Sequence, residues 1–138
     1  NVTKSTPWDA SDPKYLALLD TLAEATSDVG RYLEAADYRR KHLAGAKKYY
    51  GRNAPEVIAS MQKLALSYEC LKDDDEERKM RELVFLKSKD LYGNADLKTI
   101  DAWSNYCISL MKFPSAKKML ANQHSEILQL AENLLSQI

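Results

Sequence analysis

Glycine and proline are scarce in this chain, with four of each among 138 residues. An all-β protein needs many tight turns and normally contains more of both, so the composition favours helices. A hydrophobic fraction of 45% supplies enough apolar side chains for a core and argues against a disordered chain. The length suits one domain, because a domain typically contains about 150 residues.

Cysteine is rare as well, and the two present are Cys70 and Cys107. Two cysteines without C-x-x-C or Cys/His spacing form neither a disulfide framework nor a four-ligand zinc site, so we interpret both as reduced. No apolar run approaches the ~20 residues of a membrane span. The chain starts at Asn1 with neither a methionine nor a signal pattern. We therefore expect a piece of a longer, cytoplasmic protein that has no membrane contact.

An excess of charge of one sign is also absent, since 20 basic and 20 acidic side chains cancel. Bulk charge therefore does not favour binding to nucleic acid. The sequence has no glycine-rich phosphate loop, no G-x-S-x-G and no H-E-x-x-H, and His42 and His124 are far apart in sequence. We predict that the protein is not an enzyme, with no catalytic residue, no metal site and no cofactor.

A repeat of 42 residues is the strongest pattern in the sequence. Tyr49-Tyr50-Gly51 recurs 42 residues later as Leu91-Tyr92-Gly93. A third copy is weaker, with Met61 matched by Trp103. The same offset pairs further residues: Pro13 with Pro55, Ala17 with Ala59, Leu22-Ala23 with Leu64-Ala65, Arg39 with Arg81, Lys47 with Lys89 and Ser67 with Ser109.

Each repeat contains the signals of two helices. Ser11-Asp12-Pro13 and Asn53-Ala54-Pro55-Glu56 combine a capping side chain with a proline suited to the first helical turn, and Glu56 suggests a capping box. Apolar residues follow a period near 3.6 after both prolines. Gly30 ends the first helix, and a second helix is expected from about Arg31 to Tyr50, closed by Gly51 as Gly93 closes its counterpart.

The later repeats differ at the turn between their helices. The acidic run Asp73–Glu77 replaces the glycine break of the first repeat; we interpret it as a helix start rather than a site for metal or a basic partner. Lys112-Phe113-Pro114-Ser115 forms the third break, after which Ser115 caps a final helix from Ala116 towards Ile138. The prediction is six helices in units of about 13–53, 54–94 and 95–138, after a flank of 1–12.

Leu22-Ala23, Gly30–Ala36 and Tyr50–Val57 together resemble the tetratricopeptide repeat (TPR) family, in its 42-residue kinesin light chain-like variety. Signature positions of the first helix carry Met61, Leu64, Ala65 and Tyr68 in the second unit, and Trp103, Tyr106, Cys107 and Leu110 in the third. Glu77 departs from the family pattern, because an alanine stands there in the family. The resemblance implies an all-α fold: three antiparallel helix hairpins stacked as a right-handed superhelix (α-solenoid) with a C-terminal closing helix.

The resemblance also implies a concave groove that binds peptides. The groove positions carried onto this chain are Asp20 and Glu24 in the first unit, Gln62, Lys63 and Leu66 in the second, and Ser104, Asn105 and Ile108 in the third. Asn105 stands where the family carries an asparagine that contacts the peptide backbone, and Lys63 replaces it in the second unit. Carboxylates at the first segment argue against a carboxylate clamp and favour a basic or neutral ligand there.

The basic run Arg39–Tyr50 permits two interpretations. It is either a contact for nucleic acid or an acidic partner, or the solvated outer face of a helix, which we favour because helical geometry spreads the charges around the cylinder. The leading functional hypothesis is a protein–protein interaction module of a larger scaffold or adaptor that binds a linear peptide segment. The alternative is a structural or self-association segment that stacks through its repeat ends.

Overall fold

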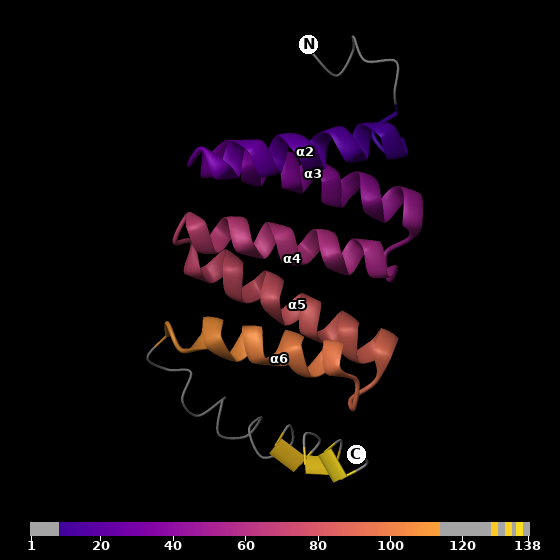
Figure 1. Cartoon of the computed structure of the whole chain (residues 1–138), viewed down its shortest axis with the longest axis vertical. Coiled ribbons are helices and arrows are strands. Elements are labelled where there is room, and N and C mark those ends of the chain that lie inside the picture. Colours follow the sequence, from indigo (N-terminus) through magenta and orange to yellow (C-terminus); the bar gives the residue numbers. More distant parts are fainter. Residues whose placement is uncertain (1–8, 114–127, 130–131, 134, 137–138) are drawn as a thin grey trace. The chain divides into compact units, whose positions relative to one another are not determined.

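The computed structural model describes residues 9–113, 128–129, 132–133 and 135–136. Within 9–113 the chain forms helices α2 (Pro13–Asp28), α3 (Tyr32–Tyr50), α4 (Pro55–Cys70), α5 (Asp74–Tyr92) and α6 (Leu97–Leu110), and no strand (Figure 1). These consecutive helices confirm the all-α fold class. The expected cap Ser115 and most of the final helix lie outside the described residues. The described helices divide into two compact units, which do not coincide with the three sequence repeats: the first compact unit contains α2, α3 and α4, and the second contains α5 and α6.

The helix starts repeat with the period of the sequence. Asp12 caps α2 by accepting a hydrogen bond from the Lys14 N–H at 2.8 Å, as the sequence predicts. Asp96 caps α6 through the Lys98 N–H at 2.8 Å. The capping box expected at Asn53 and Glu56 is wrong: Ala54 occupies the N-cap of α4, and its side chain cannot accept. Pro55 at the first helical position places the cap one residue later than the sequence suggests.

The turn after α2 recurs after α4 with the same hydrogen bonds. Arg31 N donates to Thr26 O at 2.8 Å, and Asp73 N donates to Tyr68 O at 3.0 Å, 42 residues later. One residue in each turn has a positive φ: Gly30 in the first turn, at 84°, and Lys72 in the second, at 59°. The second turn therefore keeps the left-handed residue that closes a helix, although it contains no glycine.

In the first unit, α3 packs against both α2 and α4 (Figure 1). Gly45 on α3 allows the chain before α2 to approach closely. A Cβ at this position would collide with the carbonyl oxygen of Ala10 and would lie 2.6 Å from Leu16 Cδ2. The buried apolar core comes from all three helices: Leu16, Leu19, Ala23, Ala35, Ala36, Leu43, Ala46, Val57, Ile58, Met61, Leu64, Ala65 and Tyr68.

In the second unit, α5 begins with the acidic run, which confirms its interpretation as a helix start. Glu77 is buried, at the position equivalent to the buried Ala35. Its carboxylate accepts from Lys112 Nζ at 2.5 Å and lies 3.4 Å from Arg81 Nε. Two cations thus compensate an acid where the first repeat has a small apolar residue. Tyr106, whose hydroxyl donates to Glu82 at 2.7 Å, packs with Leu110, Phe85 and Phe113 in the core.

Candidate functional site

The predicted site residues lie on three helices. Asp20 and Glu24 are on α2, Gln62, Lys63 and Leu66 on α4, and Ser104, Asn105 and Ile108 on α6. The first five belong to one compact unit and the last three to the other. Leu66 and Ile108 are exposed apolar side chains, with 46% and 57% of their surface accessible.

Lys63 joins the two predicted acidic residues into one cluster. Its Nζ lies 2.6 Å from Asp20 Oδ1 and 3.9 Å from Glu24 Oε1. The Asp20–Lys63 contact connects α2 with α4 across 43 residues of sequence. The structure therefore brings together three of the eight predicted residues, and it places Gln62 and Leu66 beside Lys63 on α4.

Arg39 is a second cation in this cluster. The prediction of a solvated outer face is wrong for this residue, because only 4% of its surface is exposed. Its guanidinium donates to Ser67 Oγ at 2.6 Å and to the Lys63 carbonyl at 3.2 Å, and lies 3.7 Å from Glu24. The guanidinium is held at the junction of α3 and α4, since a buried charge needs hydrogen bonds and an ionic partner. The recurrence of arginine at positions 39 and 81 is the sequence signal that marks this position.

Charge in this cluster is balanced, with two carboxylates facing two cations. Asp20 and Glu24 are therefore not an uncompensated acidic surface that would by itself repel an acidic ligand. Lys63 is equally engaged and is not an open cation. Any charge preference of the first unit must come from groups next to this cluster.

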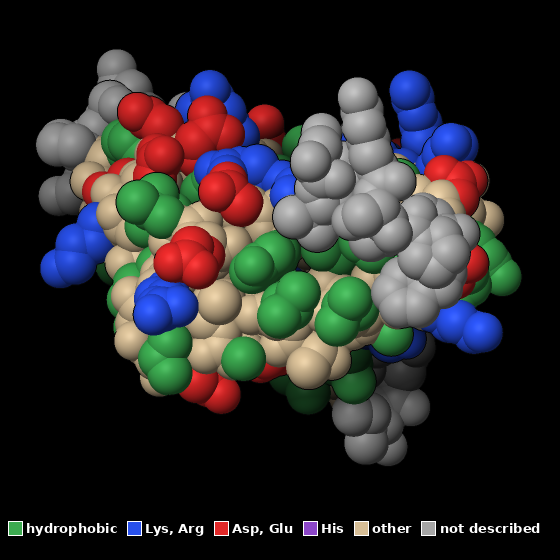
Figure 2. Space-filling view, turned by 90° about the horizontal axis from the view of Figure 1, so that it is seen from above, with side chains coloured by type: hydrophobic (Ala, Val, Ile, Leu, Met, Phe, Trp, Pro, Cys, Tyr) green, Lys and Arg blue, Asp and Glu red, His purple; other side chains and the backbone are tan. Residues whose placement is uncertain are grey.

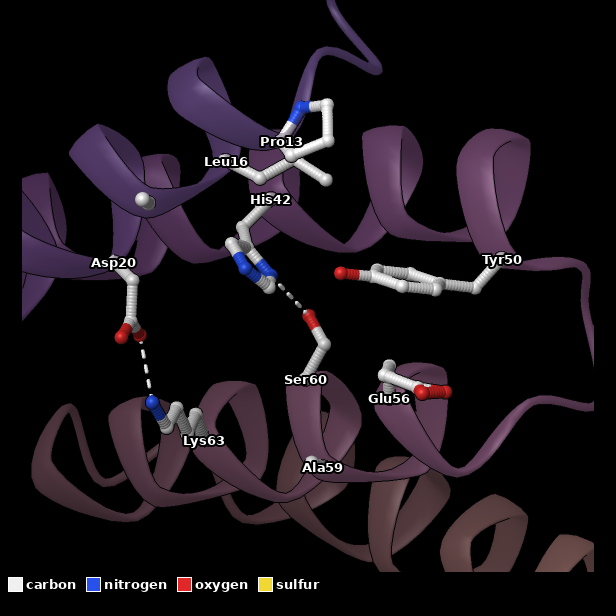
Figure 3. Close-up of a pocket in the computed structure, with 10 residues that line it drawn as sticks. Pro13, Leu16, Asp20, His42, Tyr50, Glu56, Ala59, Ser60 and Lys63 are labelled. Atoms are coloured by element: carbon white, nitrogen blue, oxygen red, sulfur yellow. Dashed lines mark hydrogen bonds and ion pairs between the residues drawn. The ribbon is translucent and has the colours of Figure 1, made fainter.

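A pocket of about 280 Å³ adjoins the cluster, between α2, α3 and α4 of the first unit (Figure 3). Two of the groove residues predicted from the family resemblance, Asp20 and Lys63, line it. The full lining is Pro13, Leu16, Ala17, Asp20, His42, Tyr50, Glu56, Ala59, Ser60 and Lys63. His42, Tyr50, Glu56 and Ser60 are not among the predicted site residues.

His42 enters the pocket from α3 and meets Ser60 of α4, with Nδ1 and Oγ 2.8 Å apart. Burial lowers the pKa of His42 below its ordinary value of 6.5; Asp20 opposes this shift and Lys63 adds to it. The neutral imidazole is therefore the main form at pH 7. Figure 3 shows the Tyr50 hydroxyl pointing towards the His42–Ser60 pair.

The described residues contain no group of three or more His, Cys, Asp or Glu side chains suited to a metal ion. Both cysteines are free, and burial raises the pKa of Cys107 to about 11, so its thiol is protonated at neutral pH. In the part of the chain that the structure describes, no helix combines the length and apolarity needed to cross a membrane.

Two solved structures share this architecture. One is a crystal structure of nearly identical TPR-like repeats assigned to a Podosopora anserina kinesin light chain. It matches this chain with a TM-score of 0.71 and 18% identity, over 98% of this chain and 60% of that one. The chain has a TPR-like fold. BtubC (BKLC) from P. vanneervenii matches with a TM-score of 0.72 and 15% identity, over 95% of this chain and 51% of that one.

These matches confirm, at the level of the fold, the resemblance of the sequence to TPR proteins. The chain spans between half and three fifths of the length of the two matched proteins. No family model and no curated protein matches the sequence. At 18% and 15% identity, the two matches show the fold of a helical repeat module.

Proposed function

We propose that this chain is the peptide-binding module of a larger scaffold or adaptor protein, acting in the cytoplasm. The peptide lies on the concave groove of a right-handed superhelix and contacts Asp20, Glu24, Gln62, Lys63 and Leu66. Ser104, Asn105 and Ile108 on α6 supply further contacts. One observation carries the proposal: groove positions of α2 and α4 converge on a charged cluster beside a pocket.

The exposed side chains of these positions suit an extended peptide. Leu66 and Ile108 present apolar surface that a peptide side chain would cover. The amides of Gln62 and Asn105 donate and accept hydrogen bonds, as a peptide backbone requires. No enzymatic activity is proposed, because the thiol of Cys107 is protonated and His42 contacts a serine that is itself buried.

A selection from a random displayed peptide library against the full chain tests this proposal. Peptides that bind should lose about tenfold in affinity when Leu66→Ala and Asn105→Ala are combined, since an anchor contact contributes on the order of 1 kcal/mol or more. The matched control combines Leu33→Ala and Leu86→Ala, which truncate exposed leucines on α3 and α5 outside the site. Fluorescence anisotropy measures both affinities.

Binding that the groove variant weakens and the control variant preserves supports the proposal. Equal loss in both variants, or the absence of any selected peptide, overturns it.

A second candidate function, self-association through a repeat end, is favoured by the exposed face of α2. Leu18 and Ala25 are the counterparts, 42 residues earlier, of Ser60 and Ser67, which α3 covers through His42 and Arg39. Leu18 is 42% exposed, whereas Ser60 and Ser67 are buried. Figure 2, viewed from the α2 end, shows exposed hydrophobic side chains gathered on this face.

Sedimentation velocity over a range of concentrations tests this second candidate. Self-association should shift the chain to a larger species as concentration rises, and Leu18→Lys should abolish the shift by placing a charge in the contact. Leu86→Lys, at an exposed leucine of α5, is the matched control. A monomer at every concentration contradicts the self-association role and leaves peptide binding as the sole candidate.

A further inference from the structure

We propose that the pocket between α2, α3 and α4 binds the side chain of a lysine or arginine residue. The inference rests on the proposed function in one respect, because the basic side chain belongs to a bound peptide. The pocket lies wholly within the first unit, so its geometry is defined by three packed helices. Its volume of about 280 Å³ is just below the range of sites for drug-sized ligands and suits a single side chain.

The charges that line the pocket favour a cation. Asp20 and Glu56 carry two negative charges and Lys63 carries one positive charge, so the lining has a net charge of −1 while His42 is neutral. Lys63 is paired with Asp20 at 2.6 Å. Glu56 has no ion-pair partner within the described part of the chain. One basic side chain would bring the charge of the pocket to zero, and an acidic one would double it.

The shape and polarity of the walls match a long aliphatic stem that ends in donors. Pro13, Leu16 and Ala59 provide apolar surface for the methylene groups, which basic side chains bury against such surfaces. Tyr50 and Ser60 also line the pocket, and their hydroxyl oxygens provide acceptors. Ser60 shares one hydrogen with His42, and its oxygen retains a free lone pair in either tautomer of the imidazole.

Other occupants fit less well. An anion would find Lys63, the cation among the described lining residues, already paired with Asp20 and Glu24. An uncharged apolar side chain would contact the apolar walls but would leave the negative charge of Glu56 uncompensated next to it. The net charge, the acceptors and the apolar stem surface agree only for a lysine or arginine side chain.

NMR titration of the full chain with Nα-acetyl-arginine methylamide tests the pocket directly. The amide signals of Ala59, Ser60 and His42 should shift in a saturable way at millimolar concentrations, and added salt should weaken the binding. Nα-acetyl-norleucine methylamide, which has a similar stem without the charge, should leave these signals in place. Equal shifts with both compounds, or no shift with the arginine compound, overturn the inference.

Glu56→Gln tests the source of the preference at nearly constant shape. It should weaken arginine binding about fivefold, the effect of a partly exposed ion pair of about 1 kcal/mol. Glu34→Gln removes an exposed carboxylate of the same unit outside the pocket and should change nothing. Unchanged affinity in Glu56→Gln contradicts the assignment of the charge.

The peptide selection separates this inference from the proposed function. Selected peptides should carry lysine or arginine at one position, and Glu56→Gln should remove that preference while peptides still bind. Peptides without any basic preference overturn the pocket assignment and leave peptide binding intact. Arginine binding without any selected peptide supports the pocket and overturns the peptide-binding function.

Discussion

Lys72 holds the same backbone position after α4 that Gly30 holds after α2, with φ of 59° and 84°. The surrounding hydrogen bonds agree, because Lys72 N donates to Glu69 O at 3.0 Å and Gly30 N donates to Ser27 O at 3.0 Å. A residue with a Cβ is strained in this conformation by about 1–2 kcal/mol, whereas glycine is not. The second turn is therefore built at a cost in stability that the first turn does not have.

The substitution Lys72→Gly should raise the free energy of unfolding of the protein. Relief of strain outweighs the larger entropy of glycine in the unfolded chain, which leaves a gain of about 0.5–1 kcal/mol in the free energy of unfolding. Urea denaturation followed by circular dichroism at 222 nm measures the change. Lys72→Ala keeps the Cβ and should have almost no effect, so an equal gain from alanine would show that backbone strain is not the cause.

The N-cap residue of α4 is Ala54, whose side chain makes no capping hydrogen bond. A side chain that can accept this bond should stabilise α4. Its φ and ψ, −73° and 149°, resemble those of Asp96, −80° and 141°, whose carboxylate caps α6. Ala54→Asp should raise the free energy of unfolding by about 1 kcal/mol, through a new hydrogen bond to the Glu56 N–H. Ala54→Asn should give a comparable gain without the negative charge next to Glu56. Ala54→Leu is the control, and a gain from leucine would contradict a capping mechanism.

The sequence predicts those features that are local along the chain. The ends of α2 and α3 follow from Asp12-Pro13, Gly30 and Gly51, because caps and turns depend on a few adjacent residues. The 42-residue period locates the later helices by analogy with the first. The start of α4 was misplaced by one residue, since Asn53 and Ala54 both precede a proline-led helix and only the structure shows which is the cap.

The burial of charge could not be predicted in the same way. Arg39 meets Ser67, 28 residues away, and Lys63 meets Asp20, 43 residues away. A basic residue in a helix has the same local pattern whether it faces water or a buried serine, so the run Arg39–Tyr50 suggested an outer face. The pocket was missed for a related reason: His42, Tyr50 and Ser60 converge from two helices and form no motif in sequence.

The pair Glu77–Lys112 should show strong energetic coupling in the second unit. Lys112→Met removes the nearer cation from a buried carboxylate and should destabilise the protein by about 1–3 kcal/mol. Glu77→Gln in the same chain removes the uncompensated charge and should recover part of the loss. A double-mutant cycle by urea denaturation gives the coupling, expected at about 0.5–3 kcal/mol. Additive effects of the two substitutions would contradict a direct interaction.

His42 should make stability depend on pH just below neutrality. Burial lowers its pKa in the folded chain below 6.5, with Asp20 raising and Lys63 lowering it, and Tyr50 and Glu56 also line its pocket. Between pH 6.5 and the lowered value, the unfolded chain binds a proton that the folded chain does not. The free energy of unfolding must therefore fall as the pH decreases through this window, by at most about 1.4 kcal/mol per pH unit.

Urea denaturation of the wild type and of His42→Gln between pH 7.5 and 5.5 measures this dependence. The glutamine amide can still bond to Ser60 but does not titrate, so the variant should lose the His42 contribution while it keeps every other titratable group, including His124. The difference between the two profiles isolates His42. Parallel profiles would mean that the imidazole is as easily protonated in the folded chain as in the unfolded one, which contradicts its burial against Ser60.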